Sequence, residues 1–412
     1  MTSGNREWSG EIPEQSRSGI SNLRFQSETV HSAKRQRDSA KIPMTDALCR
    51  PDFVTRAAPL LVCSLLAALF VVTPAGCDGD RPAKPTGTTA GSADGKAAVD
   101  CQREPIAAGE QVRIAVIPKG TTHEFWKSIH AGALKAEREL PGVQIIWKGP
   151  TKEDDRGQQI SVVENFINAG VTGIVLAPLD DVALAKPVQE AGRAGISVVV
   201  MDSALEADPC REFASFVATD NYVGGQHGAR RLGEILGGKG KILLLRYQVG
   251  SASTVQREQG FLDTLKADFP DVQVVSADQY GGATTESAYA KAENLLNRFA
   301  DLDGIFCPNE STTFGMLRAL QGSGRAGKVK FVGFDSSDKL IQAMADGELH
   351  GLVLQDPLNM GYVAVKTLVA FLRGEKVATR IDTGSAVATP ENMNDPRIRE
   401  LLSPPIDEYL LR

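Results

Sequence analysis

Hydrophobic positions in this chain form short, continuous apolar runs that alternate with longer amphipathic segments. The stretch 303–335 shows the pattern. An apolar run at 304–307 is followed by a segment in which Phe314 and Leu317 recur near helical spacing, and a second apolar run covers 329–334. Short apolar runs predict buried strands, and the segment between them predicts a helix. Strands alternating with helices predict a parallel sheet covered by helices.

Several apolar runs end in a polar side chain. Asp335 follows the run just described, Asn309 lies just beyond the run at 304–307, and Asp202 follows the run at 196–201. Ligands bind outside the carboxyl ends of the strands in open α/β sheets. A carboxylate accepts hydrogen bonds and an amide both donates and accepts them, so these side chains together predict a ligand with hydroxyl groups. Asn309 or Asp335 alone could instead cap the following helix.

The arrangement occurs twice along the chain. Strands expected at 112–117 and 173–176 belong to an earlier half, and a strand expected at 240–245 begins a later one. The fold class predicted is therefore α/β, with two similar doubly wound parallel-sheet domains that face each other. A length of 412 residues is sufficient for two domains, and 42% hydrophobic with 23% charged residues is ordinary globular composition. A formal net charge of −6 offers no basic field, which argues against a nucleic-acid partner.

The first part of the chain has a different character. Residues 1–43 are polar and lack apolar periodicity, so we interpret them as disordered or as an over-extended gene start, with Met44 as the better beginning. From Met44 a positive flank and the apolar stretch 57–73 predict a secretory signal peptide at 44–76. The alternative is a plain transmembrane anchor, for which the stretch is at the short limit.

The signal ends in small residues followed by Cys77. This arrangement resembles a bacterial lipobox, which implies a lipid anchor on Cys77, although Pro74 departs from the usual Leu or Val. Residues 77–108 are rich in Gly, Ala, Pro, Thr and Ser, which predicts a flexible linker that holds a globular body away from a membrane. In an exported compartment Cys101 and Cys210 could form a disulfide, and the sequence leaves this pairing open.

Two further features suggest ligand contacts. Phe125 and Trp126 stand at the start of the helix after the first strand, and because Phe125 shares a face with Ile129, Trp126 is expected to point elsewhere. Such a ring could stack on an apolar ligand face, or both rings could simply pack in the core. Arg257 lies where a loop enters a helix and could contact paired hydroxyls in a bidentate manner, or it could be a surface arginine.

Six motifs then occur in an order that resembles bacterial periplasmic sugar-binding proteins of the ribose-binding type, the soluble receptors of ABC importers. The resemblance covers about 112–388. The motifs are Phe125-Trp126, Val217-Ala-Thr-Asp-Asn-Tyr-Val-Gly-Gly225, Arg257-Glu-Gln-Gly-Phe261, Cys307-Pro-Asn-Glu310, Val332-Gly-Phe-Asp335 and Gln355.

The resemblance implies the type I periplasmic binding protein fold, in which a cleft separates two lobes joined by a three-segment hinge. The expected boundaries are 109–219 plus 356–382 for the N-terminal lobe, 220–355 plus 383–395 for the C-terminal lobe, and 396–412 for a C-terminal tail. No function follows from the sequence of this tail.

The resemblance also implies a ligand site. Two residues depart from the ribose receptor: His123 stands where that receptor has an Asn, and Ser203 where it has an Arg, which points away from ribose itself. No cofactor is expected, and no histidine pair at metal-ligand spacing predicts a metal site. The residues expected to contact the ligand are Lys119, His123, Phe125, Trp126, Asp202, Ser203, Arg257, Asn309, Asp335 and Gln355.

The function implied is a non-enzymatic receptor, a monomer, that captures a monosaccharide outside the cytoplasm and delivers it to an ABC transporter permease. A sensor of the same fold coupled to a signalling partner remains an alternative. A glycosidase using Asp202 and Asp335 is a weaker one, because the sequence shows no sign of a cleft acid with a raised pKa.

Overall fold

The computed structural model describes residues 100–107 and 109–411. This part of the chain contains two β-sheets of six strands each, both covered by helices. The predicted fold class, two α/β domains with largely parallel sheets, is confirmed. The disordered start at 1–43, the signal peptide at 44–76 and the lipidated Cys77 lie outside the described residues. Among the described residues, no helix combines the length and apolar character needed to cross a membrane.

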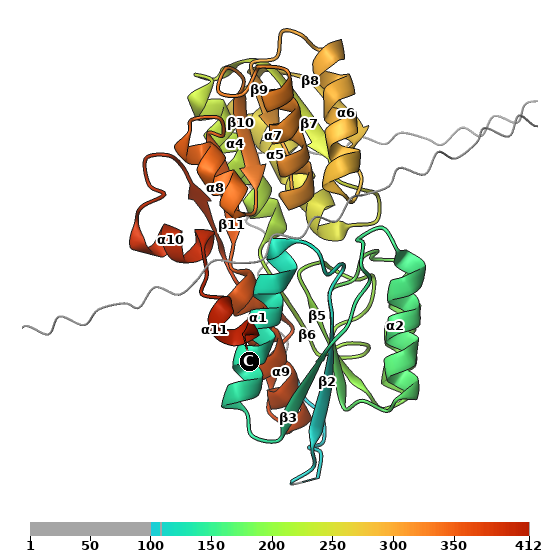
Figure 1. Cartoon of the computed structure of the whole chain (residues 1–412). Helices are drawn as coiled ribbons and strands as arrows, with labels where there is room; N and C mark the ends of the chain where they lie inside the picture. The colour runs from blue at the N-terminus through green and yellow to red at the C-terminus, as the bar shows by residue number, and fades with distance from the viewer. Residues whose placement is uncertain (1–99, 108, 412) are drawn as a thin grey trace, which may run out of the picture. The chain divides into compact units, whose positions relative to one another are not determined.

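The first sheet, with the helices that cover it, is called here the N-terminal lobe. Its strand order is β13-β6-β5-β4-β2-β3 and every pair is parallel. Figure 1 shows α1 and α9 on one side of this sheet and α2 on the other. The elements are β2 (Val112–Ile117), α1 (Glu124–Glu139), β3 (Val143–Trp147), α2 (Arg156–Asn168), β4 (Gly173–Leu176), α3 (Ala185–Arg193), β5 (Ser197–Met201), β6 (Ser215–Ala218), α9 (Pro357–Leu372) and β13 (Arg380–Asp382).

The second sheet and its helices form the C-terminal lobe, with strand order β14-β11-β10-β9-β7-β8. Its last strand, β14, runs antiparallel to β11, so this sheet is mixed at one edge. The elements are α4 (Asn221–Ile235), β7 (Lys239–Arg246), α5 (Ala252–Asp268), β8 (Asp271–Tyr280), α6 (Thr285–Arg298), β9 (Gly304–Phe306), α7 (Glu310–Gly322), β10 (Lys330–Phe334), α8 (Asp338–Ala345), β11 (Gly351–Gln355) and β14 (Ser385–Ala388).

Three chain segments pass between the lobes. They connect β6 to α4, β11 to α9 and β13 to β14. The C-terminal tail adds two short helices, α10 (Pro396–Leu402) and α11 (Asp407–Leu410). The tail therefore has secondary structure of its own.

The expectation of a flexible linker as far as residue 108 is wrong for residues 100–107. The short strand β1 (Asp100–Cys101) pairs antiparallel with β12 (Val377–Ala378). A disulfide joins Cys101 to Cys210 with 5.0 Å between their Cα atoms, and the amide of Ile106 donates to the carbonyl of Leu372 at 2.9 Å. Composition alone could not reveal this attachment, because the fixing partners lie more than 100 residues away in the sequence.

Glycines allow helices of each lobe to approach closely. A Cβ on Gly132 of α1 would lie 1.9 Å from the carbonyl oxygen of Leu358, and one on Gly225 of α4 would lie 2.0 Å from the carbonyl oxygen of Arg257. No side chain fits at such distances. The second contact holds the backbone of Arg257 against α4. The side chain of Arg257 is thereby positioned at the end of the C-terminal lobe that faces the N-terminal lobe.

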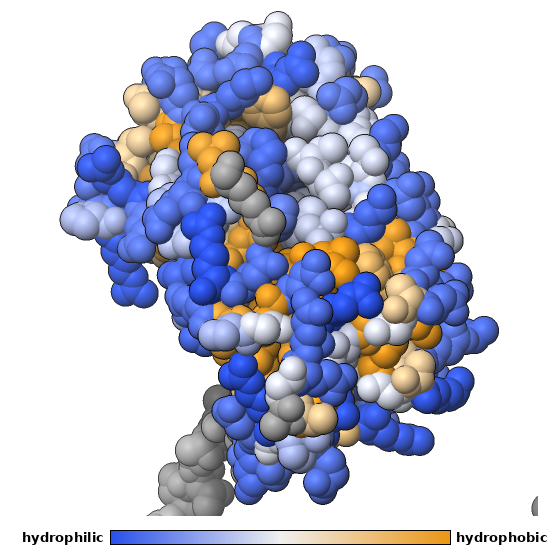
Figure 2. Space-filling view, turned by 60° about the horizontal axis from the view of Figure 1, so that its bottom comes forward, coloured by the Kyte–Doolittle hydropathy of each residue, from blue (hydrophilic) through white to orange (hydrophobic). Residues whose placement is uncertain are grey.

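The surface carries scattered hydrophobic side chains. On the face shown in Figure 2, hydrophobic residues form patches that polar residues interrupt. The most exposed large apolar side chains outside the chain end are Val249 and Val182, at 70% and 60% exposure. They stand in loops of different lobes whose backbones meet, since the amide of Asp181 donates to the carbonyl of Gly250 at 3.1 Å.

Candidate functional site

The strand ends of the two lobes converge on a cavity of about 30 Å³. Nine of the ten residues predicted to contact a ligand line it, and only Ser203 does not. Its hydroxyl oxygen lies close by and accepts a hydrogen bond from the amide of Ser253 at 3.1 Å. The predicted residues that line the cavity are Lys119, His123, Phe125, Trp126, Asp202, Arg257, Asn309, Asp335 and Gln355.

Two acids, one from each lobe, occupy equivalent positions. Asp202 follows β5 and Asp335 follows β10, and both have left-handed backbone conformations with φ of 61° and 67°. Aspartate tolerates this region better than most residues, but the conformation still costs free energy. Both side chains are buried, at 3% and 7% exposure. The backbone therefore changes direction at each of these two acids, directly after the strand ends at the cavity.

Asp335 lies at the centre of a polar network in the C-terminal lobe. One of its oxygens accepts from the side-chain nitrogen of Gln355 at 2.7 Å, and the other accepts from the amide of Glu310 at 3.0 Å. Burial raises the pKa of Asp335, while the Arg257 charge and the Gln355 hydrogen bond act to lower it. The sequence-based expectation that no cleft acid has a raised pKa is therefore wrong.

Arg257 is held rigidly but retains a donor. Its Nε donates to the side-chain oxygen of Asn221 at 2.8 Å and its Nη1 to the carbonyl of Pro308 at 3.0 Å. The guanidinium carbon lies 3.9 Å from the ring centroid of Phe334. Among the described residues no group accepts from Nη2, nor does any donate to Oε1 of Gln355. Buried polar atoms are nearly always paired, so these two atoms are candidate ligand contacts.

Lys119 supplies the positive charge beside Asp202. Its ammonium nitrogen lies 2.9 Å from a carboxylate oxygen of Asp202, and both side chains are about 4% exposed. The same nitrogen donates to the hydroxyls of Ser251 and Ser253 at 3.2 and 3.0 Å. Residue 203 is a serine in this chain, where the ribose receptor has an arginine. The cation beside Asp202 is therefore Lys119, which comes from the loop after β2.

The two aromatic rings are arranged differently from the expectation. Phe125 and Trp126 meet edge to face, with ring centroids 4.9 Å apart and an interplanar angle of 86°. Both are buried, pack in the same core cluster and line the cavity. The inference that Trp126 must point away from Phe125 is wrong, because adjacent helical side chains of this size can still meet through an edge.

Glu153, in the loop between β3 and α2, is a site residue that the sequence analysis missed. Its carboxylate accepts from Trp126 Nε1 at 2.5 Å and from the hydroxyl of Tyr247, and it pairs with His123 Nδ1 at 2.5 Å. Burial raises its pKa, but the charge and hydrogen bond of His123, with those of Tyr247 and Trp126, lower the pKa of Glu153 to about 2. Since Tyr247 belongs to the C-terminal lobe, Glu153 links the lobes.

Glu310, at the start of α7, makes a second contact between the lobes. Its two carboxylate oxygens accept from the amides of Glu124 and Phe125 at 3.3 and 3.2 Å, at the N-terminus of α1. A carboxylate is favoured there because the first amides of a helix lack partners within the helix. Burial nevertheless dominates and raises the pKa of Glu310 to about 7.

The remaining predicted residues have structural partners as well. Asn309 is the N-cap of α7, and its side-chain oxygen accepts from the amide of Thr312, so it caps the helix while lining the cavity. Asp335 does not cap α8, whose N-cap is Ser337.

The sequence analysis also missed Asn221. Its side-chain nitrogen donates to the carbonyl of Asp202 at 3.3 Å, and its side-chain oxygen accepts from Arg257, so Asn221 joins the two lobes.

Five lining residues were not predicted: Glu153, Tyr247, Ser253, Thr254 and Glu310. Glu153 and Tyr247 could have been found by the rule used for Asp202 and Asp335, since each lies in a loop beyond the carboxyl end of a strand. Glu310 was part of a quoted motif but received no role.

These pKa shifts predict how stability depends on pH. Burial lowers the pKa of His123, but Glu153, Glu310 and Asp335 raise it to about 9, so its stabilising contribution is complete below pH 6.5 and disappears as pH rises through 9. Glu310 has a pKa of about 7 in the folded protein, against an ordinary value of 4.5, so folding binds a proton between these pH values and stability falls as pH rises. Glu258, also raised to about 7 by burial, acts in the same direction.

We therefore expect the Tm of the unliganded protein, measured by calorimetry, to fall between about pH 5 and pH 9. The fall should be shallower below pH 6.5, because burial lowers the pKa of His350 to about 4 and this group gains stability as pH rises to 6.5. Glu310→Gln should flatten the part of the curve between pH 5 and 7 and leave the part above pH 7 to His123. A Tm that rises across this range would contradict the assignment.

Comparison with known proteins identifies the family. The family model described as "Periplasmic binding protein domain" matches residues 114–376. The chain belongs to the periplasmic binding protein family. Among characterised relatives of this periplasmic binding protein, a D-ribose/D-allose-binding protein of Pseudomonas aeruginosa is 30% identical over 277 residues, covering 65% of this chain and 84% of the relative.

Solved structures agree with this assignment. An ABC transporter solute-binding protein from Agrobacterium vitis with bound D-fucose is 36% identical with a TM-score of 0.68, covering 71% of this chain and 100% of that one. A carbohydrate transporter solute-binding protein from Agrobacterium radiobacter in complex with D-arabinose is 34% identical with a TM-score of 0.68, covering 72% and 100%. These relatives are binding proteins of transport systems, and this periplasmic binding protein is likewise not an enzyme.

Proposed function

We propose that the protein captures a monosaccharide between its two lobes and delivers it to an ABC importer. The observation that carries the proposal is the cavity between the strand ends, where Asp202 and Asp335 face the donors Lys119 and Arg257 beside two aromatic rings. Of the ten predicted ligand contacts, nine line this cavity and Ser203 stands at its edge.

The chemistry of the lining fits a sugar. A monosaccharide has hydroxyl edges, which need acceptors and donors, and apolar C–H faces, which pack on aromatic rings. Carboxylates, an ammonium and a guanidinium are all buried here, so each hydroxyl recognised would exchange a charge-assisted hydrogen bond in a site shielded from water. An analogue that lacks such a hydroxyl would leave a buried polar group unpaired, at a cost of about 1–3 kcal/mol.

The present arrangement of the side chains is compact. The cavity of about 30 Å³ has room for roughly one water molecule, and Glu153, Glu310 and Lys119 each contact the opposite lobe. A sugar therefore enters when these contacts separate, and we infer that it replaces some of them when the lobes close again. Binding would shift the equilibrium between open and closed forms, which a transporter can read.

The proposal also covers the cellular location of the chain and its attachment to the membrane. The matching family model is that of a periplasmic binding protein domain, and we propose that this chain is a membrane-anchored lipoprotein, exported by the signal at 44–76, lipidated on Cys77 and active as a monomer. The single disulfide seen among the described residues agrees with an oxidising compartment outside the cytoplasm.

A thermal-shift screen tests the sugar proposal directly. The body from residue 100 onward is mixed with D-fucose, D-arabinose, D-allose, D-ribose, D-tagatose, myo-inositol and xylitol, and calorimetry follows on any compound that raises Tm. A ligand present at 100 times its Kd stabilises the folded state by about 2.7 kcal/mol. We expect one or a few sugars to raise Tm without being consumed. If no compound raises it, or if a sugar is chemically converted, the proposal fails.

A further inference from the structure

The C-terminal tail connects the two lobes a fourth time. We call residues 403–410, the link after α10 together with α11, the strap. Figure 1 shows α10 beside the sheet of the C-terminal lobe and α11 beside α1 of the N-terminal lobe. Because the family match ends at residue 376, the strap lies beyond the segment that the family model describes.

One end of the strap is anchored in the C-terminal lobe through α10. Leu402 is 5% exposed and belongs to the core cluster of that lobe, with Ile398 and Leu401 packed against the same cluster. The hydroxyl of Ser336, one residue beyond the cleft acid Asp335, donates to the carbonyl of Leu402 at 3.0 Å. The start of the strap therefore moves with the C-terminal lobe.

The other end is attached to the N-terminal lobe. Arg138 of α1 donates from Nη1 to the carbonyl of Glu408 at 2.8 Å and from Nη2 to the carbonyl of Tyr409 at 3.0 Å. Its guanidinium carbon lies 5.2 Å from the ring centroid of Tyr409. A forked cation on the last carbonyls of a short helix, with an aromatic ring beneath it, fixes α11 on α1.

The link between these anchors is short and stiff. Only four residues, 403–406, separate α10 from α11, and two of them are Pro404 and Pro405. Proline fixes φ and favours an extended chain, so the link can lengthen only slightly when its two anchors move apart. Even fully extended, the steps from Leu402 to Asp407 span at most about 18 Å.

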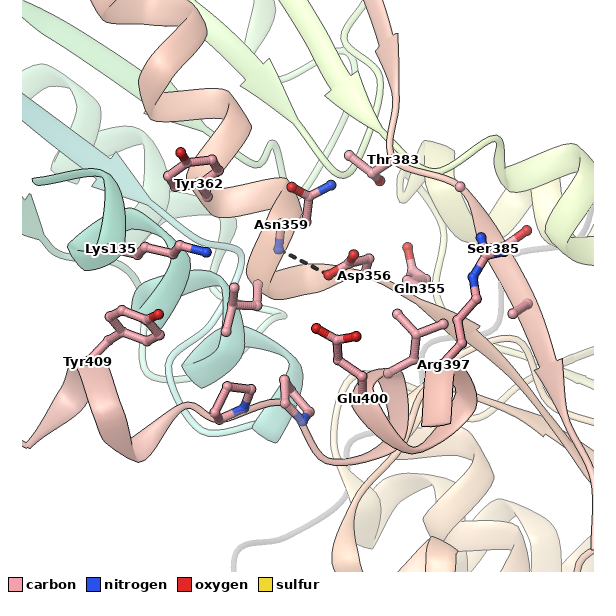
Figure 3. A pocket seen from close by; sticks show the side chains of 16 residues that line it. Lys135, Gln355, Asp356, Asn359, Tyr362, Thr383, Ser385, Arg397, Glu400 and Tyr409 are labelled. Carbon is pink, nitrogen blue, oxygen red and sulfur yellow. Dashed lines mark hydrogen bonds between the residues drawn. The ribbon is translucent and has the colours of Figure 1, made fainter. Parts of the chain in front are cut away.

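The strap also borders the cleft. Pro404 of the strap and Leu401 near the end of α10 line a small cavity together with the site residues Phe125, Asp335 and Gln355. Behind it, a larger cavity of about 350 Å³ separates the strap from the hinge. In Figure 3, Tyr409 lies below Lys135 and Tyr362 on one side of this cavity. On the other side, Glu400 of α10 lies below the hinge residue Asp356, and the side chain of Arg397 extends toward Ser385 of β14.

We propose that the strap restrains the opening of the lobes and closes the flank of the cleft beside Phe125 and Asp335. Wide separation of α1 from α10 requires either that α11 leave Arg138 or that α10 leave the core of its lobe. The strap thus favours the closed form before a sugar arrives and slows the departure of a bound one. The inference rests on the proposed function in one respect only, that the lobes move.

The test measures the distance between the lobes without any sugar. Spin labels are placed at Arg193→Cys in the N-terminal lobe and Glu286→Cys in the C-terminal lobe, both exposed, and the distance distribution is recorded by pulsed electron resonance. Three changes loosen the strap: deletion of residues 404–412, which keeps Leu402 in place, Arg138→Ala, and insertion of five Gly/Ser residues after Ser403. We expect each to lengthen the mean distance and broaden its distribution, and to weaken binding of the sugar found in the screen about tenfold as the closed fraction falls.

Arg399→Ala is the matched control, because this exposed arginine lies on α10 outside the strap. It should leave both distance and affinity unchanged. An unchanged distance distribution in a folded deletion variant overturns the inference. If the deletion variant unfolds, the insertion variant decides, since it keeps every residue of the strap. Failure of the proposed function would appear separately, as absence of any sugar effect on the unaltered protein.

Discussion

Asp335→Asn is expected to weaken sugar binding about 10- to 100-fold while the protein stays folded. The carboxylate is a buried acceptor that faces Arg257 and is oriented by Gln355 and the amide of Glu310. A hydrogen bond to a charged group contributes about 1.5–3 kcal/mol, and each 1.4 kcal/mol is a factor of ten in Kd. Asparagine has the same size and, like aspartate, tolerates the positive φ of 67° at this position. Isothermal calorimetry with the sugar found in the screen measures the loss.

Stability separates this effect from simple misfolding. Because burial raises the pKa of Asp335, the ionised carboxylate is unfavourable in the sugar-free fold, and its replacement by a neutral amide removes that cost. We expect the Tm of the sugar-free variant to stay within about 4 °C of the original. The control is Asp338→Asn, an exposed acid at the start of α8. Undiminished affinity in Asp335→Asn would place the sugar elsewhere.

Removal of the disulfide is expected to lower the free energy of unfolding by about 4 kcal/mol. Cys101 and Cys210 are 109 residues apart, and the chain-entropy estimate for a loop of about 100 residues is about 4.7 kcal/mol. The bond also holds β1 on β12 and with it the segment 100–107. In the double variant Cys101→Ser, Cys210→Ser, thermal unfolding should begin roughly 10 °C lower.

Reduction supplies the control for this prediction. Dithiothreitol should lower the Tm of the original protein to that of the double variant and should not affect the variant itself. Neither cysteine lines the cleft cavity, so the sugar affinity should remain unchanged. Equal Tm values for the oxidised and reduced forms would show that the bond adds no stability.

The fold followed from the sequence because its signals are local. A buried strand needs a short apolar run, and the carboxyl ends of parallel strands must meet at one edge of a sheet. Asp202 and Asp335 could therefore be placed in one site from position alone, and the cavity contains both. Arg257 was suggested first by its place where a loop enters a helix and then, with Gln355, by the family resemblance, and both residues lie in the same cavity.

The rest depended on how the two lobes meet. The carboxylate of Glu153 contacts Trp126 of its own lobe and Tyr247 of the other, and Glu310 reaches the first amides of α1 across the cleft. Hydrophobic periodicity indicates which face of an element is buried, but it contains no information about the distance between polar loops of different sheets. For the same reason the raised pKa of Asp335 was missed, since burial between the lobes causes it.

The sequence by itself determined two α/β lobes, a cleft at their strand ends and most of the residues in that cleft, because each of these depends on local pattern and chain order. Only the tertiary structure decided that residues 100–107 are fixed to the body, that Lys119 supplies the cation beside Asp202, and that the tail joins both lobes. These features are contacts between segments distant in the chain, and packing rather than local preference brings such segments together.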